Sequence, residues 1–436
     1  MTMNPTSCSR AVLPALLLVS GFCGISYEIL YAKLLGNLLG NQFMISASVL
    51  MTFLLGIGVG TLMAHRFVRW LWAIEAGIGL YAALLITAYP WVDRFIYSDV
   101  SLIGTSPVAS AGVAVVLLVA PAFLVGCSVP LFAAYLSTVR STHAFSVTYG
   151  IYNIGAAITA LAMEFLVLRS FGLRAATLLF AALNGLVALA LFALVRTTPI
   201  VPPPRLERLS FARLDLVGLA LASIASAIFQ LLMIKITESL IGPFNETFAL
   251  VLATVLGGLA LGSLLAARLR LRFETALLLA TVGVVSILVT LPSIATGYAA
   301  LYRTAAVSYP LHVFLKLALV VVPMGLPAIG FGATIPALLH EYRDVARESG
   351  QLLFVSSMAN VVGFLLMAFV LHRLLDYGPL LLVIAFIAAT GVIVRAGLRR
   401  APAWIALAAL MLALVGWKTV WNESLLYYGY RSFISL

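Results

Sequence analysis

Glu28 carries an ionisable group into an otherwise apolar stretch, SGFCGISYEILYAKLLGN, and is the first residue that could do chemistry. A carboxylate in hydrocarbon costs ~2.5–3.5 kcal/mol or more, so this side chain must face the protein interior, paired or protonated. There it could bind a proton or a small cation, with the phenols of Tyr27 and Tyr31 beside it. The alternative is that Glu28 only joins helices by hydrogen bonds.

Amide and phenol groups recur in three other apolar stretches. In TYGIYNIGAAITALAMEF, Tyr149 and Asn153 share one helix face, because their spacing is i, i+4. A later stretch carries Asn360, and a third carries Gln230, a neutral near-isostere of glutamate. These groups could complete a central binding site with Glu28, or they could serve only to hold helices together.

The other charged residues of the apolar stretches have simpler explanations. Lys33 and Lys235 are expected near the outer ends of their helices, where a long side chain can reach the interface. Glu164 is expected to reach the interface as well. Glu75 lies close to the cytoplasmic end of its predicted helix, and we expect it to pair with a loop arginine.

The amino-acid composition is that of an integral membrane protein. The chain of 436 residues is 63% apolar and 9% charged, and apolar runs of roughly 18 or more residues recur along it, each long enough to cross a ~30 Å hydrocarbon core. The runs are too long and too little alternating for a barrel. The net charge of +11 is spread over short loops, which argues against a nucleic-acid surface and agrees with the positive-inside rule.

We therefore expect an all-α polytopic membrane protein with twelve spans and a short thirteenth. The predicted spans are 11–36, 43–64, 69–92, 107–137, 144–168, 173–197, 214–240, 246–267, 274–293, 308–340, 349–373, 378–397 and 402–417. They give a first six-helix repeat at 1–197, a cytoplasmic linker rich in proline and arginine at 198–213, a second repeat at 214–397, and an extra helix with an aromatic tail at 398–436. Arginines in the loops after even-numbered spans place the N-terminus in the cytoplasm, and the expected location is a bacterial inner (plasma) membrane.

The two halves of the sequence match each other. Gly56 falls on Gly258 and Gly60 on Gly262 at a constant offset. Each half has an even number of spans, so both halves start on the same side of the membrane. This predicts a parallel repeat about an axis along the membrane normal, as in the two halves of major-facilitator transporters. The run GIGVG is expected to pack helices, because no strand precedes it as in a dinucleotide site.

Prolines interrupt one apolar stretch in each half. APAFLVGCSVPLF carries Pro121 and Pro130, and VPMGLPAIGFGATIP carries Pro327 and Pro336. Proline removes a backbone donor and frees a carbonyl, which is tolerated in a membrane only where protein or a cavity satisfies that carbonyl. The matched interruptions predict broken helices that form a hinge or a binding site, with a static kink as the alternative.

Several motifs carry a family resemblance. SGFCGISYEILYAKLLG, LGIGVGTLMAHR, GCSVP, YNIGAAITAL and FGLRAATLLF resemble the membrane portion of the fused major-facilitator/spermidine-synthase-like proteins, and LGGLALGSLLAAR, GFGATIP and NVVGF resemble the same pattern again. The family pattern N-x-x-G is kept from Asn360 to Gly363, whereas Asn153-Ile154-Gly155 departs from it by one residue. The resemblance covers most of the first twelve spans and implies a major-facilitator-like fold.

The resemblance does not imply an enzyme. In the fused proteins an aminopropyltransferase-like domain follows the spans, and here SLLYYGYRSFISL resembles only the opening strand of that domain. The sequence shows no glycine-rich cofactor loop, no paired acidic residues for a polyamine, and no nucleophile–base pair or metal cluster. We therefore expect no catalysis, no cofactor and no bound metal.

Two functions fit these features. The first is a transporter-like protein that moves a small polar or cationic metabolite by alternating access. The second is a non-catalytic membrane anchor or scaffold subunit of a larger complex, which binds a protein partner through the aromatic tail 421–436. We favour the first, because of the repeat, Glu28 and the prolines. The lipid bilayer is the expected partner in both cases, nucleic acid in neither, and the sequence does not specify the substrate.

Overall fold

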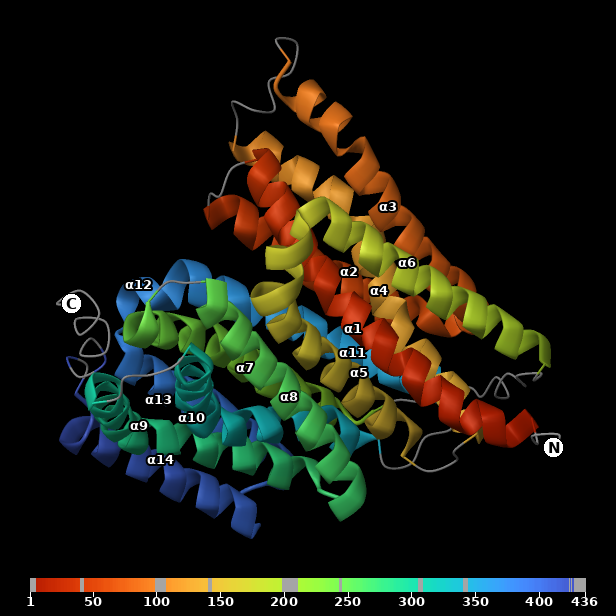
Figure 1. Cartoon of the computed structure of the whole chain (residues 1–436). Coiled ribbons are helices and arrows are strands. Elements are labelled where there is room, and N and C mark those ends of the chain that lie inside the picture. The colour runs from red at the N-terminus through yellow and green to blue at the C-terminus, as the bar shows by residue number, and fades with distance from the viewer. Residues whose placement is uncertain are drawn as a thin grey trace. The chain divides into compact units, whose positions relative to one another are not determined.

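The computed structural model describes residues 5–39, 43–98, 107–139, 143–197, 211–242, 245–304, 309–339, 344–422, 424 and 426, and nearly all of these residues lie in helices (Figure 1). The helices are α1 (Pro5–Leu39), α2 (Phe43–Met63), η1 (Ala64–Trp70), α3 (Leu71–Ile96), α4 (Pro107–Val139), α5 (Ala144–Ala162), η3 (Met163–Val167), α6 (Leu168–Thr197), α7 (Arg213–Ile241), α8 (Asn245–Leu269), α9 (Phe273–Thr304), α10 (Tyr309–Leu338), α11 (Val345–Leu365), η4 (Leu366–Leu371), α12 (His372–Leu374), α13 (Tyr377–Ala396) and α14 (Ala401–Thr419).

Eleven helical segments of the described residues are long and apolar enough to cross a membrane. Two of them, Val49–Ile96 with 48 residues and Ala144–Arg196 with 53, are too long for one crossing, because a helix rises 1.5 Å per residue and the core is ~30 Å thick. Each is interrupted by non-helical backbone, at Phe67 in the first and at Gly172 in the second. Each can therefore hold two predicted spans, so the eleven segments accommodate the thirteen expected from the sequence.

Helix α3 shows how such a segment meets the bilayer. Trp70, which directly precedes α3, and Trp91, near the end of α3, are 54% and 71% exposed, and they are separated by about 30 Å of helix. Tryptophan is enriched at both membrane–water interfaces. Leu80 and Leu84, between them, are also exposed, as expected for a surface that faces lipid.

The chain divides into two compact units by its internal contacts. Unit one contains Met1–Leu209 and Glu341–Met358, and unit two contains Ser210–His340 and Ala359–Leu436. Helix α11 therefore contributes its first part to unit one and its remainder to unit two. The predicted domain boundaries stay predictions, and most of the predicted linker lies outside the described residues.

Within each unit the same pairs of helices pack together. In unit one these pairs are α2 with α4, α1 with α6, and α3 with α6; in unit two they are α8 with α10, α7 with α13, and α9 with α13. Unit two has one further helix, α14, which packs on both α9 and α13. The buried face of α14 consists of small residues, Ala403, Ala406, Ala409, Ala413 and Gly416.

Glycines allow the closest helix pairs to form. A Cβ atom added at Gly56, Gly60 or Gly126 would lie only 2.4, 2.1 or 2.3 Å from an atom of the facing helix in the α2–α4 pair. The α8–α10 pair repeats the arrangement at Gly258, Gly262 and Gly332, with 2.2, 2.1 and 2.4 Å. No side chain fits at such distances, so the glycine backbone of one helix packs directly on the backbone or an alanine methyl group of the other. The prediction that GIGVG packs helices is confirmed.

The prolines of α4 and α10 do not divide these helices. Both helices run without interruption through Pro121 and Pro130 and through Pro327 and Pro336. In α4 a neighbouring side chain replaces a missing donor, because Tyr81 Oη donates a hydrogen bond of 2.5 Å to the Leu117 carbonyl. That carbonyl is the one that Pro121 leaves free. The expectation of broken helices is therefore corrected, while a hinge at these positions stays a prediction.

Candidate functional site

A fully buried carboxylate lies inside unit one, and it belongs to Glu75 of α3. Its exposed fraction is 0%. Ser20 Oγ and Ser128 Oγ donate to Glu75 Oε1 at 2.8 and 2.9 Å, and Asn184 Nδ2 donates to Oε2 at 2.5 Å. Both carboxylate oxygens therefore have hydrogen-bond partners, and all three donors are neutral.

Four helices build this site. Glu75 comes from α3, and its donors come from α1, α4 and α6. A second layer fixes the amide, because Tyr27 Oη of α1 donates to Asn184 Oδ1 at 2.9 Å. With its oxygen engaged by the phenol, the amide presents its nitrogen to Glu75. We call Glu75, Ser20, Ser128, Asn184 and Tyr27 the Glu75 cluster.

The structure corrects the expectation that Glu75 pairs with a loop arginine. Among the described residues no ion pair includes Glu75. Arg66 and Arg69, the nearest arginines in the sequence, lie on η1 with their side chains exposed. Glu75 instead lies on the face of α3 that is buried by the other helices, where only neutral groups reach it.

The Glu75 cluster can accommodate a proton without moving its heavy atoms. An ionised carboxylate only accepts hydrogen bonds, whereas a protonated one also donates one. A serine hydroxyl can do either by rotating its hydrogen. Ser20 and Ser128 can therefore donate to an ionised Glu75, and one of them can accept from a protonated Glu75. This chemistry suits proton binding and release.

An aromatic group adjoins the Glu75 cluster. Tyr27 and Tyr31 are both buried and stack with ring centroids 5.8 Å apart. Tyr81 meets Tyr31 edge-on at 6.5 Å. The Tyr31 hydroxyl has no hydrogen-bond partner among the described residues. Tyr31 therefore contributes packing here, and only Tyr27 of the two predicted phenols joins the polar network.

Tyr149 and Asn153 of α5 bond within their own helix. Asn153 Nδ2 donates to the Tyr149 carbonyl at 2.7 Å, and the Tyr149 ring stacks on Phe145 at 5.5 Å. Helix α5 lies very close to α1, since a Cβ at Gly155 would be 2.2 Å from the Leu18 carbonyl oxygen. The structure thus gives Asn153 a hydrogen bond to backbone in place of a partner in another helix.

Glu28, Gln230 and Asn360 differ from the Glu75 cluster. Each side chain is half-buried, and none makes a hydrogen bond or ion pair with another described residue. Glu28 belongs to unit one, and Gln230 and Asn360 belong to unit two. A central site that unites them stays a prediction.

The two matched lysines are both paired. Lys33 Nζ lies 3.4 Å from Glu164 Oε2, and Lys235 Nζ lies 2.9 Å from Glu238 Oε2. The Lys235 pair is local, within α7, and its lysine is 58% exposed. The Lys33 pair joins α1 to η3, so Glu164 binds a lysine where the sequence suggested only that it reaches the interface.

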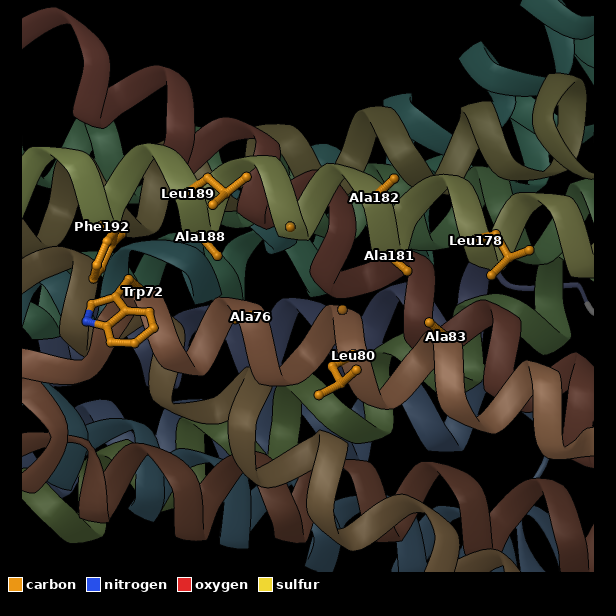
Figure 2. A pocket seen from close by; sticks show the side chains of 12 residues that line it. Trp72, Ala76, Leu80, Ala83, Leu178, Ala181, Ala182, Ala188, Leu189 and Phe192 are labelled. Atoms are coloured by element: carbon orange, nitrogen blue, oxygen red, sulfur yellow. The ribbon is translucent and has the colours of Figure 1, made fainter.

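A separate cavity of about 630 Å³ lies between α3 and α6 (Figure 2). We call it the α3–α6 groove, and its lining is almost entirely apolar, with Trp72 and Phe192 close together at one end and small residues along its length: Ala76, Gly79, Ala83, Ala181, Ala182, Gly185 and Ala188. Leu80 and Leu189 flank it and are strongly exposed. The groove offers a polar solute almost no hydrogen-bond partners. It therefore does not provide a polar binding site, in contrast to the Glu75 cluster.

The sequence contained a signal for the Glu75 cluster. Glu75 stands in the apolar stretch LWAIEAGIGL, and Asn184 stands in AALNGLVAL. A carboxylate and an amide inside membrane helices both call for partners, as argued for Glu28. Ser20 and Ser128 carried no such signal, because serine is common in membrane helices.

Comparisons with known proteins give a partial similarity. No family model matches the chain. Over 196 residues the chain is 29% identical to proteins described as polyamine aminopropyltransferase from Mycobacterium tuberculosis, strains CDC 1551 and H37Rv, and from Mycobacterium bovis. The match covers 42% of this chain and 34% of each relative, so the chain spans about a third of the length of these curated relatives.

Proposed function

We propose that the protein is a transporter-like integral membrane protein that moves a small cationic metabolite by alternating access, with Glu75 as its proton-binding group. The Glu75 cluster carries this proposal. A carboxylate that is 0% exposed and held by three neutral donors is expensive to keep in a membrane helix, and such groups mark proton relays and ion pathways. A purely structural role would be filled at lower cost by an apolar residue.

Two carboxylates of unit one, those of Glu75 and Glu28, suit different roles. Glu75 already has three hydrogen bonds and can exchange a proton within them. Glu28 is half-buried and has no partner among the described residues, so it is the better ligand for an amine. We assign the proton to Glu75 and a cationic substrate group to Glu28.

A major-facilitator-like arrangement of six plus six helices, related by a parallel two-fold repeat, belongs to the same proposal. Its support is that the α2–α4 and α8–α10 pairs have glycines at matching positions with matching close approaches. Ligand sites in such folds lie between the repeats near the middle of the membrane. Helix α14 is then an addition to the second repeat.

Polyamines are the first substrate class to test. The proteins of the partial similarity are described as polyamine aminopropyltransferase, and polyamines are flexible cations. A carboxylate with amide and phenol groups around it is the chemistry that binds an ammonium group. The similar proteins are named for an enzyme, and we propose no such activity for this chain.

Uptake into proteoliposomes tests the proposal. We expect labelled putrescine or spermidine to accumulate when a pH gradient is imposed, and the variant Glu75→Gln to lose the dependence on the gradient while keeping exchange of substrate between the two sides. Glu164→Gln is the matched control, because it neutralises a carboxylate that only pairs with Lys33. Gradient-driven uptake that survives Glu75→Gln would rule out Glu75 as the proton site, and absence of any uptake by the native protein would rule out the substrate class.

The orientation is also proposed. We place the protein in the plasma membrane of a bacterium. Its N-terminus and the arginine-rich loops after the even-numbered predicted spans then lie in the cytoplasm, because cytoplasmic loops are enriched in arginine. Labelling of a single cysteine introduced at Arg399 or at Ser98 by an impermeant maleimide on intact cells tests this orientation. We expect the second position to react and the first to be protected.

The α3–α6 groove supports a second candidate function, a membrane scaffold. In unit two the faces of α9 and α13 are covered by α14, whereas in unit one the groove between α3 and α6 is open (Figure 2). A transmembrane helix of a partner would fit an apolar groove lined by alanine and glycine. Filling the groove by Gly185→Leu, where an added Cβ meets open space, should then remove a stoichiometric membrane partner on purification and leave polyamine uptake unchanged.

A further inference from the structure

A second cavity, of about 520 Å³, lies at one end of unit two. It is formed where α9 begins, where α10 and α13 end, and beside the start of α14. Its lining residues are Arg272, Phe273, Glu274, Ala337, Leu338, Arg395 and Arg400. We call it the arginine cavity. It shares no residue with the Glu75 cluster, which belongs to unit one.

The charges around the arginine cavity are unequal. Arg395 Nε forms an ion pair with Asp215 Oδ1, and Arg395 Nη1 lies 3.7 Å from Glu274 Oε1. Both nearby acids therefore face the same arginine. Arg272 and Arg400 are exposed, and neither makes an ion pair with a described residue. Three guanidinium groups thus face two carboxylates, which leaves a net charge of +1, and the two arginines without an ion pair lie at the rim.

Helix dipoles do not change this balance. Two helices begin at the cavity and two end there, so the partial positive charges of the first pair oppose the partial negative charges of the second. The side chains decide the sign of the potential, and it is positive. An anion is therefore the ligand that the cavity favours.

The cavity also has an apolar wall. Phe273 and Ala337 are 2% and 6% exposed, and Leu338 lies beside them. The preferred anion is therefore one that carries an apolar part next to its charge. Guanidinium groups bind phosphate through paired hydrogen bonds, and basic pockets between transmembrane helices bind the headgroups of anionic lipids.

We propose that the arginine cavity binds a phosphate group, with Arg272 and Arg400 as its ligands and Arg395 held beside them by Asp215 and Glu274. An anionic phospholipid is the ligand that would contact both the arginines and the apolar wall. Its phosphate would lie on the arginines, and its glycerol and first methylenes would lie against Phe273 and Leu338. A soluble phosphate would use the arginines alone.

A pair of double variants tests the site. R272Q/R400Q removes the two rim arginines, and R270Q/R399Q removes the same charge from the same two segments at positions outside the lining. The purified protein in detergent is mixed with phosphatidylglycerol or phosphatidylcholine, and native mass spectrometry counts the lipid retained. We expect the native protein and R270Q/R399Q to retain one phosphatidylglycerol in preference to phosphatidylcholine. We expect R272Q/R400Q to bind it about 25-fold more weakly, since each arginine near a membrane surface contributes a factor of about five.

Two further measurements complete the test, one with inorganic phosphate and one with a lysine double variant. Inorganic phosphate replaces lipid in a thermal-shift assay, and a shift with phosphate but no retained lipid would support the arginine site and assign it a soluble source. The variant R272K/R400K keeps the charge and loses the paired hydrogen bonds, so it should bind with intermediate strength. Equal binding by the two glutamine variants, or no preference for the anionic lipid together with no phosphate effect, would overturn the proposal.

Discussion

The Glu75 cluster of unit one and the Arg395 ion pairs of unit two hold their carboxylates in different ways. Unit one buries the carboxylate of Glu75 completely and satisfies it with hydroxyl and amide donors. Unit two keeps Asp215 and Glu274 in the first turns of two helices and pairs both with Arg395 in the last turn of a third. These charges also suit the helix dipoles at those ends.

The matching positions of unit two make the contrast sharper. At the offset that relates Gly56 to Gly258, Glu75 corresponds to Leu277 and Ser20 to Ala222, both buried. Thr334 stands where the α10 sequence matches Ser128, and its hydroxyl bonds the Phe331 carbonyl of its own helix at 2.7 Å. Equivalent helix pairs thus form with or without an interior carboxylate. Small residues set the packing, and the polar cluster is an addition to it.

The largest loss of stability is expected at the close-packed glycines that the two units share. Gly126→Ala and Gly332→Ala each push a Cβ into a backbone 2.3 or 2.4 Å away, and each should lower the free energy of unfolding by about 3 kcal/mol. Unfolding in mixed micelles by a denaturing detergent measures this. Gly112→Ala, on the same helix as Gly126 but facing open space, should change little. A large loss for one glycine and none for its match would break the comparison.

The next-largest loss of stability is expected in unit one alone, at Glu75. Glu75→Leu copies the residue of unit two, but it leaves Ser20, Ser128 and Asn184 without their acceptor. Hydrogen bonds between membrane helices contribute about 0.6 kcal/mol each on average, so we expect a loss of about 2 kcal/mol. The same unfolding assay applies. Adding Ser20→Ala and Ser128→Ala to Glu75→Leu should recover part of this loss, and no recovery would mean that the donors do not depend on Glu75.

A smaller, salt-sensitive effect is expected in unit two. Arg395→Gln leaves Asp215 and Glu274 facing each other without a cation, at side chains that are 15% and 11% exposed. Since the arginine itself is 34% exposed, water screens the loss, and we expect about 1 kcal/mol. Thermal denaturation at low and high ionic strength checks this. The effect should shrink with salt, whereas that of Glu75→Leu should not; equal salt dependence would show that the two sites are not different in kind.

The smallest effect concerns one hydrogen bond. Tyr81→Phe removes the donor that serves the Leu117 carbonyl next to Pro121, and we expect a loss of about 0.6 kcal/mol. Tyr89→Phe on the same helix is the control, because Tyr89 makes no hydrogen bond with a described residue. Equal unfolding free energies for the two variants would mean that the freed carbonyl needs no partner.

The sequence predicted what depends on local properties. Span length and apolar character follow from consecutive residues, and the described helices α7, α8, α13 and α14 begin and end within a few residues of the predicted spans. The Glu75 cluster depends on distant residues instead. Asn184 is 109 positions from Glu75, and Ser20 is 55 positions away, so no spacing rule joins them. The prediction of broken helices from the proline positions was wrong for a similar reason. The hydrogen-bond donor for the Leu117 carbonyl comes from another helix, 36 positions away in the sequence.

The division of the chain also sets an order of assembly during synthesis. Unit one includes Glu341–Met358, which leaves the ribosome only after the whole of Ser210–His340. At 5–20 residues per second these intervening residues, about 130 of them, take roughly 7–26 s to make. During that interval α2 has its neighbour α4 but lacks its contacts with α11, since Gly350 packs on the Thr61 carbonyl and Met358 on Gly58. We therefore expect the nascent first unit to lack its contacts with α11 until translation has passed Met358.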